Sequence, residues 1–402
     1  MASEGMTTHN QGRWDRITQT YHGGQDWRNI GNFIEDFSVT TNGLGTPASA
    51  LEAARRAVDE ISHYPPADFE PALTDLASFL WPEEGNIYKP LLLLGNGASE
   101  LIDLVIRQAK PGKWRPGNTV TQYKEYERSA KAAGFTTTDA GDASASLLCM
   151  VNPTNPTGDY MSVEAVKAYI EGTSAPGSTV IVDESMQPWI GPHWRQDSLI
   201  HQREWVARIS AEKGVHVWVM TSWTKIWSCT GIRLGSVVAP NPEALLELKA
   251  KQVPWSVNCV ALAFLSSVVH DEAYLASTWE LTPQWNKALR AELSIHFPSW
   301  TVHGEVYLSW VWVDTHDVDT TAEAVRLASA AGTPVRSAGP GYNMPTFFRI
   351  AVRDPKVTSI LIVRTEKLRR KINKISIFAL RKRRKSRMVS SNLVITTRTL
   401  II

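Results

Sequence analysis

Cysteine and long apolar runs are both scarce in this chain of 402 residues. Its three cysteines, Cys149, Cys229 and Cys259, are widely spaced, which indicates neither a disulfide framework nor a zinc site, so no metal is expected. No apolar run approaches the roughly 18 residues that a membrane-spanning helix needs. The polar residues 1–15 lack the apolar segment of a secretory signal. We therefore expect a cytoplasmic protein with no membrane partner.

Acidic residues are almost missing from the C-terminal end. Of the 42 Lys and Arg and 40 Asp and Glu in the chain, 13 bases and one acid fall within residues 364–402, which leaves 29 bases against 39 acids in the rest. The run "RKRRKSR" suggests an added nuclear-targeting or anion-binding segment. A non-homologous end from altered splicing or a shifted reading frame is the favoured alternative. No nucleic-acid motif occurs in residues 1–363, so no nucleic-acid partner is expected.

Short apolar runs alternate with stretches of helical spacing as far as residue 240. Strands are expected within 90–97, 146–153, 178–185 and 214–222, and helices within 48–61, 70–80, 98–109 and 162–172. This alternation predicts an α/β fold in which helices cover both faces of a mostly parallel sheet, in three layers. Long helical stretches at 241–253 and 259–277, followed by strand-like runs at 306–314 and 347–354, predict a smaller α+β domain.

The predicted organisation has four parts: an N-terminal arm (1–30), a large domain (31–240), a small domain (241–363) and the basic tail (364–402). The chain has sixteen tryptophans, and those in "SWVWV" and "WVMTSW" lie in strand-like runs, so core packing is the expected role of these side chains.

A glycine turn joins the first predicted strand to a helix in "LLLLGNGASELIDL". Such a turn exposes backbone N–H groups at the positive end of a helix dipole, which is an anion site best suited to phosphate. An ordinary turn capped by Ser99 or Asn96 remains an alternative. The stretch has neither a Walker lysine nor the third glycine of a dinucleotide motif.

Polar residues also follow two later strands. Prolines stiffen "VNPTNPTG" and would hold the Asn155 amide toward a ligand, although an ordinary rigid connection explains the loop equally well. "VIVDES" ends on Asp183 and Glu184 at the sheet edge where ligands bind. A carboxylate there could hold a proton on a heteroaromatic nitrogen, bind a metal or cap a helix.

Lys225 lies among small hydroxyls in "TSWTKIWSCTGIRLG", directly after a predicted strand, with Arg233 eight positions on. Burial and a nearby cation lower the pKa of an amine, which is what condensation with a carbonyl requires. In this order, the glycine turn, Asn155, Asp183, Lys225 and Arg233 together point to pyridoxal 5′-phosphate (PLP).

The motifs "GNGASE", "NPTNPTG", "VDES", "SWTK" and "GIRLG" resemble those of the fold-type I, class I/II aminotransferases. The similarity spans about residues 20–362 and is strongest to the branch of histidinol-phosphate aminotransferase and threonine-phosphate decarboxylase. "HGG" (22–24), "HYPPADF" (63–69) and "KQVPWSVN" (251–258) resemble the decarboxylase side. The resemblance implies a large PLP-binding domain and a small C-terminal domain.

The resemblance also implies roles for individual residues. Lys225 would form a Schiff base with PLP and move the substrate proton, Asp183 would pair with the pyridine nitrogen, and Tyr123 would stack on the ring. Asn155 would hydrogen-bond the ring O3′. The residues implied to hold the phosphate in the same subunit are Ala98, Ser99, Ser222, Thr224 and Arg233. Tyr64 would reach the phosphate of the cofactor in the neighbouring subunit of a homodimer.

Substrate contacts follow from the same resemblance. Arg349 would hold the α-carboxylate of a small-molecule substrate in the forked geometry of a guanidinium. Arg336, Arg353 and His22 are candidates for a second anionic group, with a surface role as the alternative. Asn42 and Trp255 are expected near the substrate.

Two positions depart from the family pattern. Met186 stands where the aminotransferases usually carry a tyrosine that points at O3′, and "NGLG" (42–45) replaces "NPLG". Three functions are weighed. The first is a PLP-dependent aminotransferase acting on an amino acid or a phosphorylated amino donor, the second a PLP-dependent decarboxylase of a phosphorylated amino acid, and the third a non-catalytic binding protein with this fold.

Overall fold

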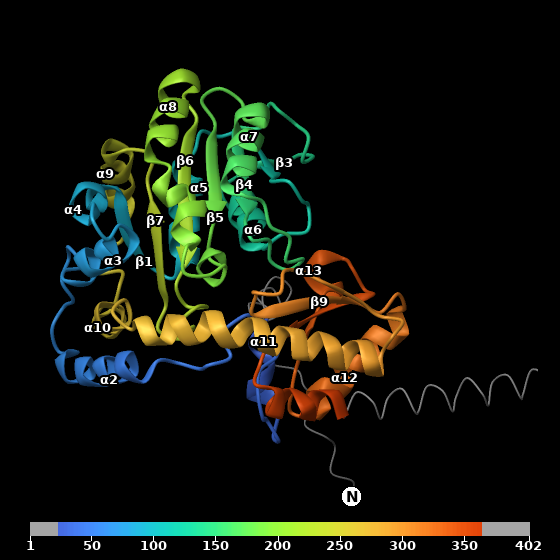
Figure 1. The fold of residues 1–402 in the computed structure, drawn as a ribbon. Coiled ribbons are helices and arrows are strands. Elements are labelled where there is room, and N and C mark those ends of the chain that lie inside the picture. The colour runs from blue at the N-terminus through green and yellow to red at the C-terminus, as the bar shows by residue number, and fades with distance from the viewer. Residues whose placement is uncertain (1–22, 364–402) are drawn as a thin grey trace, which may run out of the picture.

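The computed structural model describes residues 23–363, which form a larger part around one sheet and a smaller part around another (Figure 1). The larger sheet has the strand order β1-β7-β6-β5-β4-β2-β3. Its strands are β1 (Leu92–Asn96), β2 (Lys113–Pro116), β3 (Thr136–Thr137), β4 (Leu147–Val151), β5 (Thr179–Asp183), β6 (His216–Ser222) and β7 (Leu234–Val238). β2 to β6 pair in parallel and β7 runs antiparallel to both β6 and β1, so the prediction of a mostly parallel α/β sheet is confirmed.

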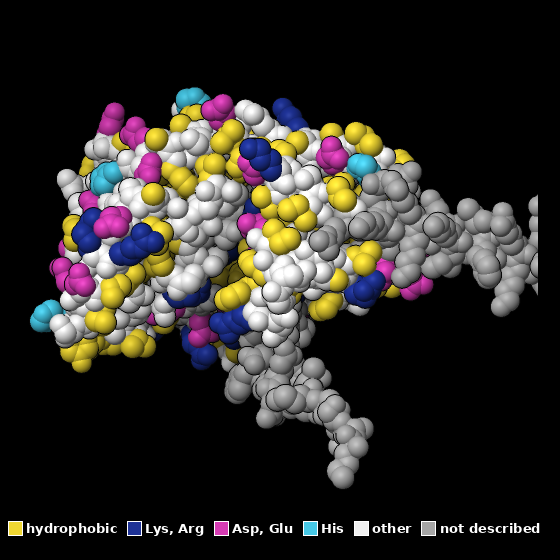
Figure 2. Space-filling view, turned by 90° about the horizontal axis from the view of Figure 1, so that it is seen from below, with side chains coloured by type: hydrophobic (Ala, Val, Ile, Leu, Met, Phe, Trp, Pro, Cys, Tyr) yellow, Lys and Arg dark blue, Asp and Glu magenta, His cyan; other side chains and the backbone are white. Residues whose placement is uncertain are grey.

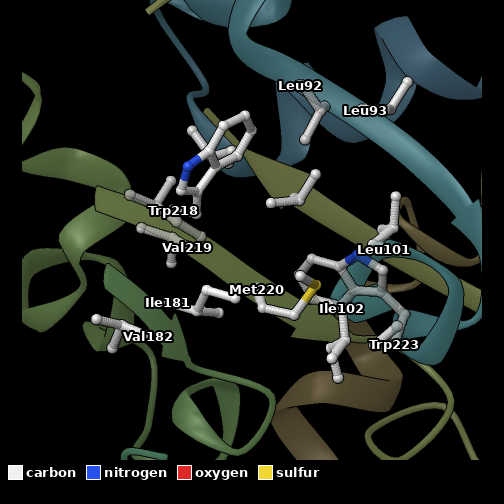
Figure 3. Packing of buried hydrophobic residues seen from close by; sticks show 14 of the residues in the cluster. Leu92, Leu93, Leu101, Ile102, Ile181, Val182, Trp218, Val219, Met220 and Trp223 are labelled. Atoms are coloured by element: carbon white, nitrogen blue, oxygen red, sulfur yellow. The ribbon is translucent and has the colours of Figure 1, made fainter. Parts of the chain in front are cut away.

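Three inner strands of the larger sheet are buried along their whole length because helices cover the sheet. Every residue of β4, β5 and β7 is buried, as near-continuous apolar runs in parallel sheets generally are. In Figure 1, α8 (Arg203–Lys213) is drawn in front of β6 and α5 (Ala98–Gln108) behind it. Figure 3 shows Leu101 and Ile102 of α5 beside Met220 of β6 and the buried Trp223. The tryptophans of these strands pack in the core, as expected.

Local signals set the ends of several helices. Ser162 caps α7 (Val163–Thr173) by accepting a hydrogen bond from the Ala165 backbone N–H. Gly214, at φ +65°, ends α8 in the left-handed conformation that suits glycine. The remaining helices before residue 259 are α2 (Ala48–Ala57), α3 (Ala72–Leu80), α4 (Gly85–Tyr88), α6 (Glu125–Ala132) and α9 (Pro242–Lys251). The described residues before 259 also form six 3₁₀ turns, at Asp26–Asn29, Val58–Glu60, Lys89–Leu91, Gln187–Trp189, Trp194–Asp197 and Leu199–His201.

The helical stretch expected at 259–277 is two helices. α10 (Cys259–Val268) ends before α11 (Glu272–His296), because Asp271 caps the second helix through a hydrogen bond from the Tyr274 N–H. Within residues 23–363, no single helix has the length and apolar composition needed to cross a bilayer; α10 and α11 meet that test only together and are bent by 76° at their break. α11 runs from the larger part to the smaller one (Figure 1).

The smaller sheet has the order β10-β11-β9-β8, and all its pairs are antiparallel. Its strands are β8 (Thr301–His303), β9 (Trp310–Asp314), β10 (Arg336–Ser337) and β11 (Phe347–Ala351). The helices α12 (Val318–Ala330) and α13 (Gly339–Tyr342) lie between these strands in the sequence. A second core combines this sheet with Leu289 and Leu293 of α11 and with Phe37. Side chains of α9 and α10 belong to the first core, and the predicted domain boundary at residue 240 stays a prediction.

Candidate active site

A pocket of about 580 Å³ lies at the edge where β4, β5 and β6 end. Parallel strands bring the residues after their carboxyl ends to one place, which is where ligands bind in sheets of this kind. The pocket collects eight of the predicted site residues: Ala98, Ser99, Tyr123, Asn155, Asp183, Ser222, Lys225 and Arg233. Thr40, Val151, Ser185 and Met186 complete its lining.

Lys225 enters the pocket from the turn that follows β6. Its Nζ lies 3.0 Å from Thr224 Oγ1 and 3.4 Å from Ser222 Oγ, so the small hydroxyls of the motif surround the amine. Burial, with the Arg233 guanidinium as the next cause, lowers the pKa of Lys225 to about 8. The sequence predicted these two causes, and they leave a larger share of neutral, nucleophilic amine near neutral pH.

Asp183 is the last residue of β5 and is buried. Its Oδ1 accepts a hydrogen bond from the Ser185 backbone N–H at 2.8 Å, and its Oδ2 accepts one from the Tyr126 hydroxyl at 2.9 Å. Burial raises the pKa of Asp183, while these hydrogen bonds and Lys225 oppose the rise. The Ser185 N–H that donates to Asp183 lies outside any helix, and the next 3₁₀ turn has Met186 as its N-cap. The alternative in which Asp183 caps a helix is therefore wrong.

Tyr126 was missed by the sequence analysis. It follows Tyr123 by three positions, and the two rings meet edge to face with centroids 6.3 Å apart. Tyr123 precedes α6 and Tyr126 is the second residue of that helix, so helical spacing does not relate them and no signal in the sequence identified Tyr126.

The first turn of α5 forms a cradle with Arg233. Gly97 is the N-cap and no side chain caps the helix, so the alternative in which Ser99 or Asn96 caps it is wrong. A Cβ added at Gly97, where φ is +76°, would lie 2.2 Å from Arg233 Nη2, and one added at Gly235 would lie 2.4 Å from the Ala98 backbone nitrogen. Glycine at both positions thus lets a guanidinium and an uncapped helix N-terminus converge, which suits a phosphate.

Arg349 in β11 lies at the mouth of the pocket. Its Nη1 donates to Asn155 Oδ1 and its Nη2 donates to the Ser38 carbonyl at 2.7 Å. Its buried Nε has no hydrogen-bond partner among the described residues, and burial lowers the pKa of Arg349 to about 10. A buried guanidinium with a donor to spare is a ready partner for a carboxylate.

A wider cleft continues from the pocket and is rich in arginine. Arg336 pairs with Arg349 across β10 and β11, and both line the cleft with Arg28, Arg233 and Tyr342. Figure 2 shows Lys and Arg side chains beside the hollow between the two parts of the molecule. Arg28 was not among the predicted residues. His22 lies outside the described residues.

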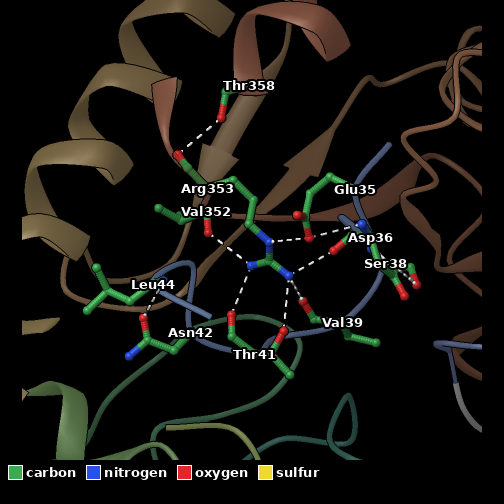
Figure 4. A network of polar contacts seen from close by, with 10 residues as sticks. All are labelled: Glu35, Asp36, Ser38, Val39, Thr41, Asn42, Leu44, Val352, Arg353 and Thr358. Atoms are coloured by element: carbon green, nitrogen blue, oxygen red, sulfur yellow. Dashed lines mark hydrogen bonds and ion pairs between the residues drawn. The ribbon is translucent and has the colours of Figure 1, made fainter. Parts of the chain in front are cut away.

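Arg353 does not reach the cleft, although it was a candidate for a second anionic group. It is 5% exposed, and its guanidinium donates to Glu35 Oε1 at 3.0 Å and to the carbonyls of Asp36 and Thr41 at 2.8 and 2.9 Å (Figure 4). These contacts fasten residues 35–41 to the smaller sheet. The geometry therefore gives Arg353 a structural role.

Replacing Arg353 by alanine is expected to lower the free energy of unfolding by about 3 to 5 kcal/mol, because buried acceptors lose their charged donor. Denaturant unfolding of the purified chain measures this. Arg56→Ala is the matched control, since Arg56 is exposed on α2 and pairs with Glu52, and a change within about 0.5 kcal/mol is expected there. Equal effects of the two substitutions would contradict the structural role.

Asn42 is also a structural contact. Its Nδ2 donates to the Ile226 carbonyl at 3.0 Å and to Thr278 Oγ1 at 2.8 Å, and its backbone N–H donates to the Lys225 carbonyl at 3.0 Å. The side chain does not line the pocket or the cleft. Asn42 supports the segment that carries Lys225 instead of facing a ligand.

Tyr64 and Trp255 lie together away from the pocket. Their rings stack with centroids 4.4 Å apart, and the two residues are 77% and 46% exposed. Tyr64 lines neither the pocket nor the cleft of its own chain, and its contact with a partner's cofactor stays a prediction.

The chemistry of the donor set fits PLP. The pocket offers an amine of lowered pKa for the aldehyde, a buried carboxylate for the ring nitrogen and a cradle for the phosphate. Met186 is buried and lines the pocket, so the pocket has a thioether at the position where the family usually carries a tyrosine.

Comparison with known proteins agrees with this geometry. The chain is 28% identical over 264 residues to threonine-phosphate decarboxylase of Salmonella typhimurium (61% of this chain, 67% of that enzyme). It is 28% identical over 354 residues to histidinol-phosphate aminotransferase 2 of Ralstonia nicotianae (83% and 88%). The structure of histidinol-phosphate aminotransferase from Sinorhizobium meliloti, a complex with PLP, superposes with a TM-score of 0.73 at 17% identity and covers 91% of this chain and 100% of that one.

The family assignment rests on the sequence match itself. The aminotransferase class I and II family matches residues 35–364, which is most of the chain. This confirms the predicted family, its fold and its PLP dependence. The tail from 365 onward falls outside the match, and residues 364–402 lie outside the described residues, so its role is untested. The chain is a member of the PLP-dependent aminotransferase class I and II family of enzymes.

Proposed function

We propose that this chain is a PLP-dependent aminotransferase that takes its amino group from an amino acid or a phosphorylated amino donor and binds its cofactor covalently at Lys225. When bound, PLP withdraws electrons from the bonds at the substrate Cα. The observation that carries the proposal is the convergence of Lys225, Asp183 and Arg233 on one pocket with Arg349 at its mouth.

Each of these residues has a role that its surroundings support. The neutral Lys225 amine would move the substrate proton from Cα to the C4′ carbon of the cofactor. The Asp183 carboxylate would hold a proton on the ring nitrogen. Tyr123, which lines the pocket, would stack on the ring, and Asn155 would hydrogen-bond the ring O3′.

Charge in the cleft supports an anionic substrate. The buried Arg349 would hold the α-carboxylate, which fixes the Cα bond that stands perpendicular to the ring. Arg336, opposite Arg349, would hold a second anionic group such as a phosphate. Four arginines line this cleft and no carboxylate does so among the described residues.

Decarboxylation of a phosphorylated amino acid is the second candidate. Similarity to the Salmonella typhimurium enzyme supports it, as do "HGG" and "KQVPWSVN". The same pocket serves both reactions, because the orientation of the carboxylate decides whether the proton or carbon dioxide leaves Cα.

One experiment separates these functions. The full-length protein, loaded with PLP, is mixed with plain and phosphorylated amino donors and 2-oxoglutarate. We expect glutamate together with a keto acid or aldehyde. Carbon dioxide without glutamate would establish the decarboxylase instead. A protein that binds PLP but yields neither product would be the non-catalytic binding protein.

We also propose a homodimer, because the exposed Tyr64 and Trp255 stack would be covered by a second copy. The predicted cytoplasmic location remains a prediction.

A further inference from the structure

Tyr126 lies behind the pocket, against the carboxylate of Asp183. Its side chain is fully buried, and its hydroxyl donates to Asp183 Oδ2 at 2.9 Å, while the Ser185 N–H donates to Oδ1 at 2.8 Å. Both carboxylate oxygens therefore have a protein donor. The neighbouring Tyr123 lines the pocket itself, but Tyr126 does not.

The groups around Asp183 come from several elements. Lys225 lies in the turn after β6, and Tyr123 lies just before α6. Glu184 is next in sequence, and its own carboxylate accepts from Ser198 and from the Leu199 N–H. Among these neighbours Lys225 is the cation, and its amine would be bonded to the aldehyde of PLP in the loaded enzyme. The remaining donors, Tyr126 and Ser185, must then oppose the cost of burying a charged carboxylate.

We propose that Tyr126 is a positioning residue whose hydroxyl keeps the Asp183 carboxylate ionised and oriented toward the ring nitrogen of PLP. The inference rests on the proposed function. Met186, in the pocket where the family usually places a phenol, offers no hydroxyl. The protonation of the ring nitrogen would therefore depend on Asp183 and on its two donors, Tyr126 and the Ser185 N–H.

The conservative substitution Tyr126→Phe removes the donor and keeps the ring in the core. Without that hydrogen bond, Asp183 binds a proton more readily, so its pKa rises. PLP pairs with the ionised carboxylate, and its affinity is lost as the pH falls through the pKa of Asp183. In the variant this loss begins at a higher pH than in the wild type.

The test measures the dissociation constant of PLP for the full-length apoprotein by equilibrium dialysis, from mildly acidic to mildly basic pH. At pH values below the pKa of Asp183, Tyr126→Phe is expected to weaken PLP binding about tenfold, because one lost hydrogen bond to a charged group raises that pKa by about one unit. At pH values well above the pKa of Asp183, the two proteins should bind PLP equally. Tyr160→Phe is the matched control. It removes a hydroxyl bound to Asp197, outside the pocket lining, and should leave the dissociation constant unchanged.

A cofactor analogue with carbon in place of the ring nitrogen separates positioning from packing. Its affinity should be the same for wild type and Tyr126→Phe. If the variant binds PLP as the wild type does at every pH, or loses affinity for the analogue equally, the inference is overturned. If the wild type itself takes up no PLP, the proposed function fails first and the inference fails with it.

Discussion

Replacing Lys225 by alanine is expected to reduce amino-group transfer at least about 10⁴-fold, because one amine both attaches the cofactor and moves the Cα proton. Steady-state rates of glutamate formation measure this loss. In the wild type, borohydride reduction followed by peptide mass mapping should place the PLP label on Lys225.

Lys249→Ala is the matched control. Burial lowers the pKa of Lys249 as well, but this lysine lies over the Phe69 ring, away from the pocket. Activity and labelling should be unchanged in that variant. A label on any lysine other than Lys225 would contradict the assignment.

The pH dependence of PLP attachment to the apoprotein should reveal the lowered pKa of Lys225. The neutral amine is the reactive form, so the rate should rise with pH and level off above the Lys225 pKa of about 8. An ordinary lysine, with a pKa of about 10.4, would still be mostly protonated there. A rate that keeps rising well beyond pH 8 would contradict the effect of burial and Arg233.

Replacing Arg349 by alanine is expected to lower kcat/KM about 10³-fold for donors with an α-carboxylate, since two charge-assisted hydrogen bonds are lost. An amino donor without that carboxylate should lose little. The comparison is made on the PLP-loaded variant, whose retained cofactor absorbance shows that the pocket is intact. Equal losses for both donors would mean that Arg349 supports the site, through Asn155 and Ser38, without holding the carboxylate.

Much of the larger part of the fold followed from local pattern. The runs at 146–153, 178–185 and 214–222 are buried strands because they are continuously apolar. β7 was not predicted, and its antiparallel direction depends on pairing with β1 and β6, far away in the sequence. The stretch 259–277 was taken as one region of helix, because the cap at Asp271 interrupts a pattern that otherwise continues.

Substrate-side residues were harder to predict. Arg336 and Arg353 look alike in sequence, yet one lines the cleft and the other ties residues 35–41 to the smaller sheet. Asn42 also turned inward, to Ile226 and Thr278. Tyr126 carried no motif of its own, and its contact with Asp183 joins α6 to β5.

The sequence alone determined the family, the cofactor chemistry and the order of Asn155, Asp183, Lys225 and Arg233, because a strand end or a glycine turn marks each of their positions within a few residues. The tertiary structure alone decided which cations face the ligand, which carboxylate oxygen meets a phenol and how far burial shifts each pKa. Those properties depend on groups brought together from distant parts of the chain, and residue spacing does not encode such distances.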